Sequence, residues 1–228
     1  MGGFDGTSNI LAGKLFGIPV SGTHAHAFVC SFTADEKLPD PFIVDTKGNK
    51  VNFVELVFSI REELGFTSTN TSELIAFTAF ARSMPNNALL LVDTYETLTS
   101  GVLNFLIIAL ALHRLGYEAK GIRLDSGDLA YLSIQARNEF IKFSKQFGVE
   151  YFANFSIVAS NDISESTLES LNQQGHKIDV FGIGTNLVTC QSQPALGCVY
   201  KLVELEGIPR IKLSQDISKV TLPGKKVF

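Results

Sequence analysis

Short apolar runs alternate with longer amphipathic stretches through the middle of the chain. The apolar runs predict buried strands, and the stretches between them have the helical spacing of apolar residues, each ending at a glycine. Parallel strands buried on both faces are continuously apolar, and strands that alternate with helices favour parallel pairing. The pattern therefore predicts an α/β barrel or a doubly wound sheet. The expected strands are 88–92, 119–124, 155–159 and 180–183, and the expected helices are 98–115, 129–147 and 164–174.

The pattern changes on both sides of this region. A glutamate and a glycine at 206–207 separate two apolar segments, which predicts an antiparallel hairpin. Prolines and charges predict a surface loop over 33–50. We expect residues 1–195 to form the α/β domain and 196–228 to form a separate β-hairpin segment. Before the central region we expect helices at 8–16, 51–64 and 72–83, and a brief strand at 18–20.

Composition indicates a well-packed globular protein. Of 228 residues, 45% are hydrophobic and 18% charged, and the net charge of −4 without a basic run argues against nucleic-acid binding. The cysteines Cys30, Cys190 and Cys198 are too few and too scattered for a disulfide framework or a zinc site, so we expect a reducing, cytoplasmic location. The apolar segment 102–112 is too short to span a bilayer, and no secretory leader is evident. We expect no membrane association.

Polar residues follow each of the four predicted strands. In an α/β barrel the carboxyl ends of the strands form the face on which active sites lie, so we expect one shared site there. The turn after the second strand is the densest of them. Ser126 or Asp128 is a candidate helix cap, but capping does not explain Arg123 and Asp125 just before the turn. The strand-end residues are Asp93 and Thr94; Arg123, Asp125 and Asp128; Ser160, Asn161 and Asp162; and Gly184 and Thr185.

Two further segments carry candidate chemistry. A Gly-x-Gly-Thr sequence ends at Gly184 and Thr185, where backbone N–H groups are suited to bind an anion, although a simple tight turn has the same composition. His24 and His26 lie two residues apart after an apolar run. Without a third ligand they make a poor zinc pattern, and a structural role is the alternative for either. His113 has no such neighbours.

Several of these segments together resemble nicotinate phosphoribosyltransferase. The resemblance runs in the correct order through nearly the whole chain, and so many matches are not chance. The segments that carry it are 5–9, 22–26, 91–95, 123–129, 182–185, 200–202, 212–213 and 221–225.

The resemblance implies an irregular, here partial, α/β barrel of the type II phosphoribosyltransferase kind with a C-terminal β-hairpin extension. It also implies an enzyme of NAD salvage that joins nicotinate to 5-phosphoribosyl-1-pyrophosphate. The products are nicotinate mononucleotide and pyrophosphate, and ATP hydrolysis is coupled through a phosphohistidine. Carboxylates and Mg²⁺ would stabilise the oxocarbenium-like ribose and the departing pyrophosphate.

The family pattern Gly-Thr-x-Ala-His implies that His26 is the phosphorylated residue, whereas His24 falls at the variable position and is expected to be dispensable. Asp93 and Asp125 are implied as catalytic residues and Mg²⁺ ligands. Arg123 is implied beside the nicotinate ring. The remaining substrate-binding residues are Thr94, Ser126 and Asp128, with Gly184 and Thr185 at the 5-phosphate.

The family's members are considerably longer, and they complete their sites across a homodimer interface. We therefore expect a natural truncation or a partial gene model, inactive or nearly so in isolation. One alternative is a nicotinamide phosphoribosyltransferase, which normally has a proline where Leu124 stands. A barrel aldolase is disfavoured because these strand ends have no lysine. The last alternative is a catalytically silent fragment that acts as an interaction module.

Overall fold

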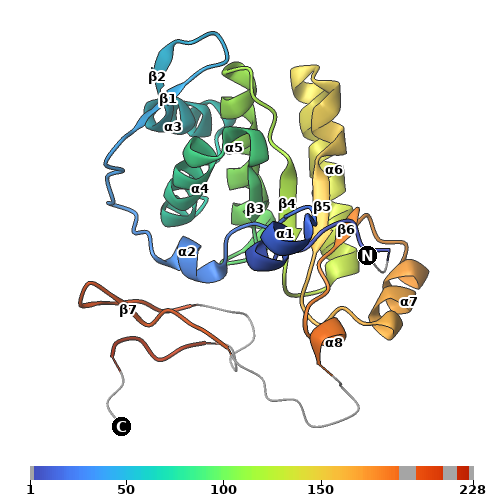
Figure 1. The fold of residues 1–228 in the computed structure, drawn as a ribbon. Helices are drawn as coiled ribbons and strands as arrows, with labels where there is room; N and C mark the ends of the chain where they lie inside the picture. The colour runs from blue at the N-terminus through green and yellow to red at the C-terminus, as the bar shows by residue number, and fades with distance from the viewer. Residues whose placement is uncertain (1–2, 190–198, 213–219, 226–228) are drawn as a thin grey trace.

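A four-stranded parallel sheet forms the centre of the molecule (Figure 1). The computed structural model describes residues 3–189, 199–212 and 220–225. The strands lie in chain order, with Leu89 paired to Gly121 and Gly121 paired to Ser156. The predicted parallel pairing is confirmed, and the described strands form an open sheet. They are β3 (Leu89–Leu91), β4 (Gly121–Leu124), β5 (Ser156–Ala159) and β6 (Val180–Phe181).

Long helices connect these strands, as the apolar spacing predicts. The Asp128 side chain caps the first turn of α6 by accepting a hydrogen bond from the Tyr131 N–H, and Gly148 ends the helix with φ of 66°. The helix before it begins with a π-helical turn, Thr97–Gly101. The connecting helices are α5 (Val102–Arg114), α6 (Leu129–Phe147) and α7 (Glu165–Gln174), with a 3₁₀ turn at Glu150–Asn154.

The hydrophobic core lies around α5, whose residues are buried on nearly every side. Helices α3 (Phe53–Leu64) and α4 (Thr71–Ser83) pack against it. Between α5 and α6, the Phe155 ring forms edge-to-face pairs with Phe105 and Phe140 at centroid distances of 4.9 and 5.3 Å, and the Phe105 and Phe140 rings pack at a tilt with centroids 5.6 Å apart. By length and composition alone Thr97–Arg114 is apolar enough to cross a membrane, but 67% of it is buried inside the fold, as expected of a core helix.

The N-terminal part differs from prediction in three places. The expected loop 33–50 contains the strand β1 (Phe42–Val44), which pairs with β2 (Lys50–Asn52). Asp45 closes the hairpin by accepting hydrogen bonds from two backbone N–H groups of the turn. The expected strand at 18–20 is reduced to a single bridge between Thr7 and Val20, and the short helix α2 (His26–Cys30) was not predicted.

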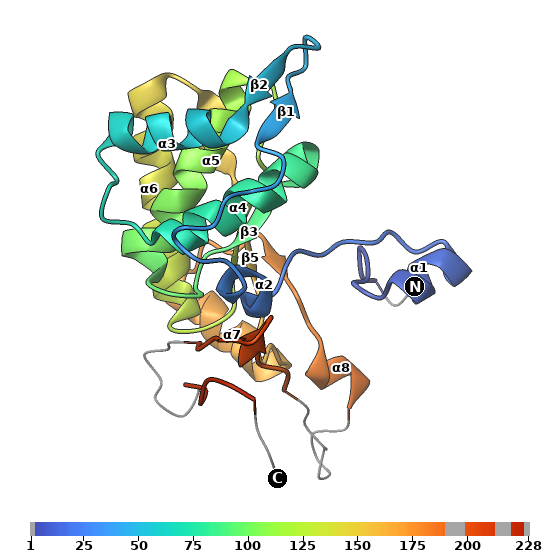
Figure 2. The ribbon, with the colours of Figure 1, turned by 90° about the vertical axis from the view of Figure 1, so that its left-hand side faces the viewer.

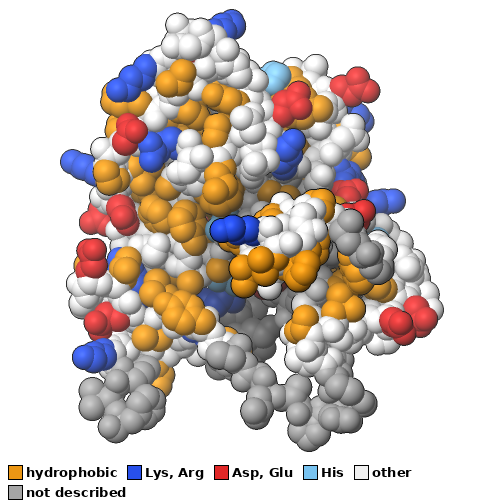
Figure 3. Space-filling model, in the orientation of Figure 1, with side chains coloured by type: hydrophobic (Ala, Val, Ile, Leu, Met, Phe, Trp, Pro, Cys, Tyr) orange, Lys and Arg blue, Asp and Glu red, His pale blue; other side chains and the backbone are white. Residues whose placement is uncertain are grey.

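Helix α1 (Ile10–Phe16) forms as predicted but has no buried residue. Figure 2 shows it standing away from the helices that cover the sheet, and Figure 3 shows hydrophobic side chains on its surface. Ile10, Leu11, Leu15 and Phe16 are each more than 60% exposed, with exposed fractions of 75%, 63%, 64% and 73%.

The C-terminal hairpin is confirmed in a short form. Strand β7 (Glu204–Leu205) pairs antiparallel with β8 (Ile208–Pro209), and both turn residues, Glu206 and Gly207, have positive φ. The predicted domain boundary at 195/196, together with Cys190 and Cys198, lies outside the described residues. Cys30 is a buried free thiol, as expected.

Candidate active site

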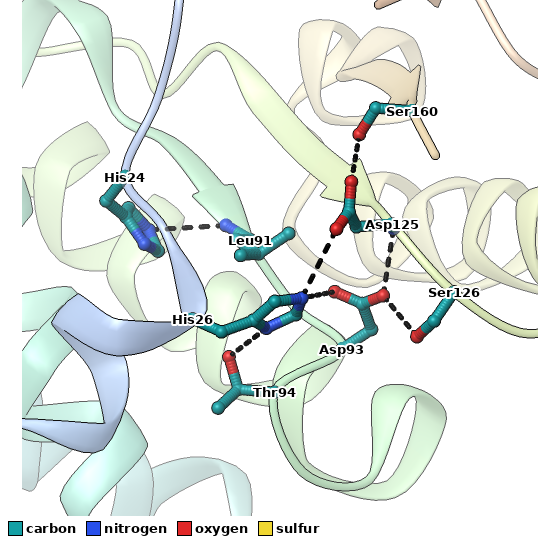
Figure 4. Close-up of polar contacts among 8 residues, drawn as sticks. All are labelled: His24, His26, Leu91, Asp93, Thr94, Asp125, Ser126 and Ser160. Carbon is teal, nitrogen blue, oxygen red and sulfur yellow. Dashed lines mark hydrogen bonds and ion pairs between the residues drawn. The ribbon is translucent and has the colours of Figure 1, made fainter. Parts of the chain in front are cut away.

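The carboxyl ends of β3 and β4 and the start of α2 meet at a cluster of polar side chains (Figure 4). His26 is the first residue of α2 and lies between two carboxylates. Its Nε2 is 3.4 Å from an Asp125 oxygen and 3.8 Å from an Asp93 oxygen, and its Nδ1 is 3.0 Å from the Thr94 hydroxyl. Both ring nitrogens are therefore oriented by groups that follow strands of the sheet.

Asp93 joins the two strand ends. It is 5% exposed, and its Oδ2 accepts hydrogen bonds from the Asp125 N–H at 2.8 Å and the Ser126 hydroxyl at 2.6 Å. Its other oxygen, Oδ1, is buried, has no hydrogen-bond partner among the described residues and faces His26. A buried carboxylate oxygen without a partner is costly, and such groups are typical of ligand or metal sites.

Asp125 is held in its ionised form. Burial pushes the pKa of its carboxyl upward, but hydrogen bonds from His26 and Ser160, with the positive charge of Arg123, outweigh it and lower the pKa below the usual value. The Ser160 hydroxyl, which follows β5, donates to Oδ1. The sequence identifies Ser160 as a strand-end residue, but Ser160 is not among the residues to which it assigns a role in the site. The structure makes it the partner that orients Asp125.

The remaining candidate residues fall into two groups. Arg123 is half-buried on β4 at the same edge, and its Nε has no hydrogen-bond partner among the described residues. Asp128 is the helix cap of α6, one of the two alternatives for that role, while Ser126 binds Asp93. Among the described residues, no hydrogen bond or ion pair joins Gly184 or Thr185 to His26 or its two carboxylates. Both residues are exposed at the start of α8 (Thr185–Val188).

His24 points away from the carboxylates. It is 8% exposed, and its Nε2 accepts a hydrogen bond from the Leu91 N–H at 3.2 Å. The rings of Phe28, Phe77 and Phe80 surround it at centroid distances of 4.8–5.9 Å. Burial lowers its pKa to about 4, so it is neutral at physiological pH. The structural role left open for one of the two histidines thus belongs to His24.

A second polar network lies beneath the site and was not predicted. Glu73 is fully buried, and one of its oxygens accepts hydrogen bonds from the Ser100 hydroxyl at 2.6 Å and the Asn104 amide at 2.9 Å. Burial raises the pKa of Glu73 to about 7. The network joins α4, the π-helical turn and α5. Asn104 within an otherwise apolar helix was the one signal in the sequence that pointed to it.

No protein-family model matches the chain. Comparison with curated proteins shows that 99% of the chain matches nicotinate phosphoribosyltransferases. It is 61% identical to that of Dictyostelium discoideum over 226 residues and 45% identical to that of Homo sapiens over 235 residues. The chain spans 38% and 44% of the length of these two relatives.

Solved structures agree with these matches. A crystal structure of human nicotinic acid phosphoribosyltransferase superposes with a TM-score of 0.73 and 39% identity, covering 98% of this chain and 43% of that one. The nicotinate phosphoribosyltransferase of Porphyromonas gingivalis has a TM-score of 0.60 at 20% identity over 95% of this chain and 48% of that one, which shows the same fold. Over almost its whole length the chain therefore resembles nicotinate phosphoribosyltransferases, and it corresponds to about two fifths of the length of these curated relatives.

Proposed function

We propose that this chain supplies part of the catalytic centre of an enzyme that transfers a 5-phosphoribosyl group to nicotinate. The reaction consumes 5-phosphoribosyl-1-pyrophosphate and yields nicotinate mononucleotide and pyrophosphate, a step of NAD salvage in the cytoplasm. The observation that carries the proposal is the position of His26, with Nε2 between the carboxylates of Asp93 and Asp125 at 3.8 and 3.4 Å. The family's pattern of site residues supports it.

Transfer breaks the bond between ribose C1 and the pyrophosphate oxygen, which leaves with the electron pair, and the nicotinate ring nitrogen then bonds to C1. Positive charge grows on the sugar while the bonds exchange. The Asp125 carboxylate, which has a lowered pKa and is therefore ionised, is suited to stabilise that charge. The Arg123 Nε has no hydrogen-bond partner in the part of the chain that the structure describes, and its guanidinium is suited to bind the nicotinate carboxylate.

ATP coupling would proceed through His26. Its Nε2 lone pair, which is free in the tautomer that has the ring proton on Nδ1, attacks the γ-phosphorus of ATP, and the bond to the ADP oxygen breaks with its electron pair passing to ADP. The Asp93 and Asp125 carboxylates, whose oxygens lie 3.8 and 3.4 Å from Nε2, are suited to stabilise the positive charge that develops on the imidazole ring. Thr94 fixes the ring through Nδ1 at 3.0 Å, so that Nε2 is the nitrogen presented to the substrate side. Hydrolysis of the phosphohistidine by water then releases phosphate.

The same carboxylates fit a magnesium ion. No group of three or more His, Cys, Asp or Glu side chains in the described part of the chain is arranged to hold a metal by itself. Mg²⁺ is commonly held by one or two carboxylates together with substrate phosphates and water, and within the described part of the chain the Asp93 Oδ1 atom lacks a hydrogen-bond partner. Asp93 and Asp125 would hold the ion. When bound, it would neutralise charge on the departing pyrophosphate.

A chimera tests the proposal. The 226-residue match allows this chain to replace the corresponding segment of the Dictyostelium relative, whose remaining length supplies the rest of the protein. We expect the chimera to form nicotinate mononucleotide from nicotinate, and to carry an acid-labile phosphate after incubation with ATP. His26→Ala should abolish the phosphate, and His113→Gln, which alters a distant histidine, should not.

Other outcomes would overturn the proposal. A chimera that prefers nicotinamide would support the sister enzyme, and a folded chimera without turnover would support a silent module.

The isolated chain should bind 5-phosphoribosyl-1-pyrophosphate weakly in calorimetry and turn over little or not at all. Size-exclusion chromatography of the chimera tests the expected homodimer.

A further inference from the structure

The edge of β3 that faces away from β4 is covered by side chains. In β3 and the residues that flank it, the backbone groups of every second residue bond to β4. The Val92 N–H donates to Arg123 O, and Ala88 O accepts from the Lys120 N–H. Leu89 and Leu91 therefore present their backbone groups to the opposite edge, where the described sheet has no further strand. An open edge of this kind leaves polar groups without partners unless something covers it.

Two consecutive side chains satisfy those groups. The Thr23 hydroxyl donates a hydrogen bond to Leu89 O, and His24 Nε2 accepts one from the Leu91 N–H at 3.2 Å. The two bonds have opposite polarity and are two residues apart on β3, as the bonds of a neighbouring strand would be. Thr23 and His24 thus take the place of a strand along this part of the edge.

The same segment continues directly into the site. His26 lies two residues after His24, and its Nδ1 is 3.0 Å from Thr94, which lies three residues after Leu91. The chain from 23 to 26 therefore contacts β3 and its carboxyl end at three successive points. Thr23 and His24 make two of these contacts, and neither residue belongs to the group around the Asp93 and Asp125 carboxylates.

We infer that His24 is a positioning residue, which fixes the start of α2 on the edge of β3 and thereby places the His26 ring between Asp93 and Asp125. Only an unprotonated Nε2 accepts the Leu91 N–H, and the ring stays neutral because it is buried among Phe28, Phe77 and Phe80. The inference rests on the proposed function for its catalytic consequence. Its structural part is independent of that function.

His24→Met tests this inference in the full chain, since methionine fills a similar volume but cannot replace the ring acceptor. We expect faster hydrogen exchange at the Leu91 amide and a changed ¹⁵N shift of His26 Nδ1, because that nitrogen loses its fixed distance to Thr94. His24→Gln, whose side-chain oxygen restores an acceptor, should recover much of both signals. His113→Met is the control, because it makes the same change at a partly buried histidine whose ring contacts Tyr151 and not the site.

A second readout concerns chemistry. In the chimera, the rate of phosphate transfer from ATP to His26 should fall about ten- to a hundredfold on His24→Met, because a misplacement of about 1 Å costs up to about that much. If His24→Met does not fold, Thr23→Val with Thr23→Ser as its rescue makes the same test at the adjacent bond. A folded His24→Met with unchanged His26 and Leu91 signals would overturn the inference. Absence of phosphorylation in the unaltered protein, with the spectroscopic changes intact, would count against the proposed function alone.

Discussion

The carboxylate of Asp93 accepts a hydrogen bond from the backbone N–H of Asp125 at 2.8 Å. One oxygen of Asp93 thus holds the turn after β4, while the other faces His26 at 3.8 Å. Asp93, which follows β3, therefore has two roles: its carboxylate holds the turn after β4 in place and also contributes to the site. Substitutions at this position should separate the two roles.

Asp93→Ala should lower the free energy of unfolding by about 1–3 kcal/mol, because the Asp125 N–H and the Ser126 hydroxyl lose their acceptor. Asp93→Asn keeps an oxygen acceptor and should recover most of that stability, but not phosphate transfer to His26. Urea unfolding of both variants checks the first part. Asp128→Asn is the control, since asparagine caps a helix as well as aspartate; equal losses in all three variants would contradict the assignment.

Glu73 should make stability depend on pH. Burial raises its pKa from 4.5 to about 7 in the folded chain, so folding favours the protonated form. The associated stability is fully present below pH 4.5 and is lost as pH rises through about 7, a loss of about 3 kcal/mol. Glu73→Gln should remove this loss, because its oxygen still accepts from Ser100 and Asn104 and its amide carries no charge.

Urea unfolding of the unaltered chain and of Glu73→Gln at pH 5 and pH 8.5 makes the comparison. We expect the variant to be the more stable protein at pH 8.5 and the difference to shrink at pH 5. Glu63→Gln, at an exposed partner of Arg114, should show no comparable gain at high pH. A Glu73→Gln variant that is less stable at both values would show that the network requires the carboxylate.

Much of the fold was predictable because its signals are local. Helix α6 has the predicted bounds, since Asp128 caps one end and Gly148 terminates the other. Continuous apolar runs located the four parallel strands. The β1–β2 hairpin was missed because prolines and charges around it are typical of loops, and its strands are three residues each.

The candidate site was predictable only in part. Residues at strand ends must approach one another when the strands are parallel, which is why Asp93, Asp125 and Ser126 come together as expected. The fully buried Glu73 and the edge contacts of His24 depend on pairs far apart in the chain. No local pattern reports such pairs, because only the packed fold brings them within hydrogen-bond distance.

The π-helical turn Thr97–Gly101, which follows Asp93 and Thr94 in the chain, requires a glycine at its last position. A Cβ at Gly101 would lie 1.9 Å from Val92 O, whereas one at Gly22 would meet only Ser8 Cβ at 4.0 Å. Gly101→Ala should therefore force the backbone apart just before Asp93 and cost about 1–3 kcal/mol or more of stability. Gly22→Ala should cost much less. Thermal unfolding of the two variants decides the matter, and equal midpoints would show that the turn adjusts without strain.

Arg61 organises the connection between α3 and α4. It is 7% exposed, and its guanidinium donates to Phe66 O at 3.3 Å, to the Thr71 hydroxyl at 3.1 Å, and to the carbonyls of Thr67 and Thr69. A lysine has a single nitrogen and cannot reach all four acceptors, so Arg61→Lys should cost about 2–3 kcal/mol.

The control for this prediction is Arg114→Lys, which alters an arginine whose ion pair with Glu63 is exposed to solvent. Lysine can keep such a pair, and exposed pairs contribute little, so the free energy of unfolding should change by less than about 1 kcal/mol. Urea unfolding at neutral pH measures both variants. If Arg61→Lys costs no more than Arg114→Lys, the carbonyls of the α3–α4 connection must find other donors, and the arginine does not determine how α4 begins.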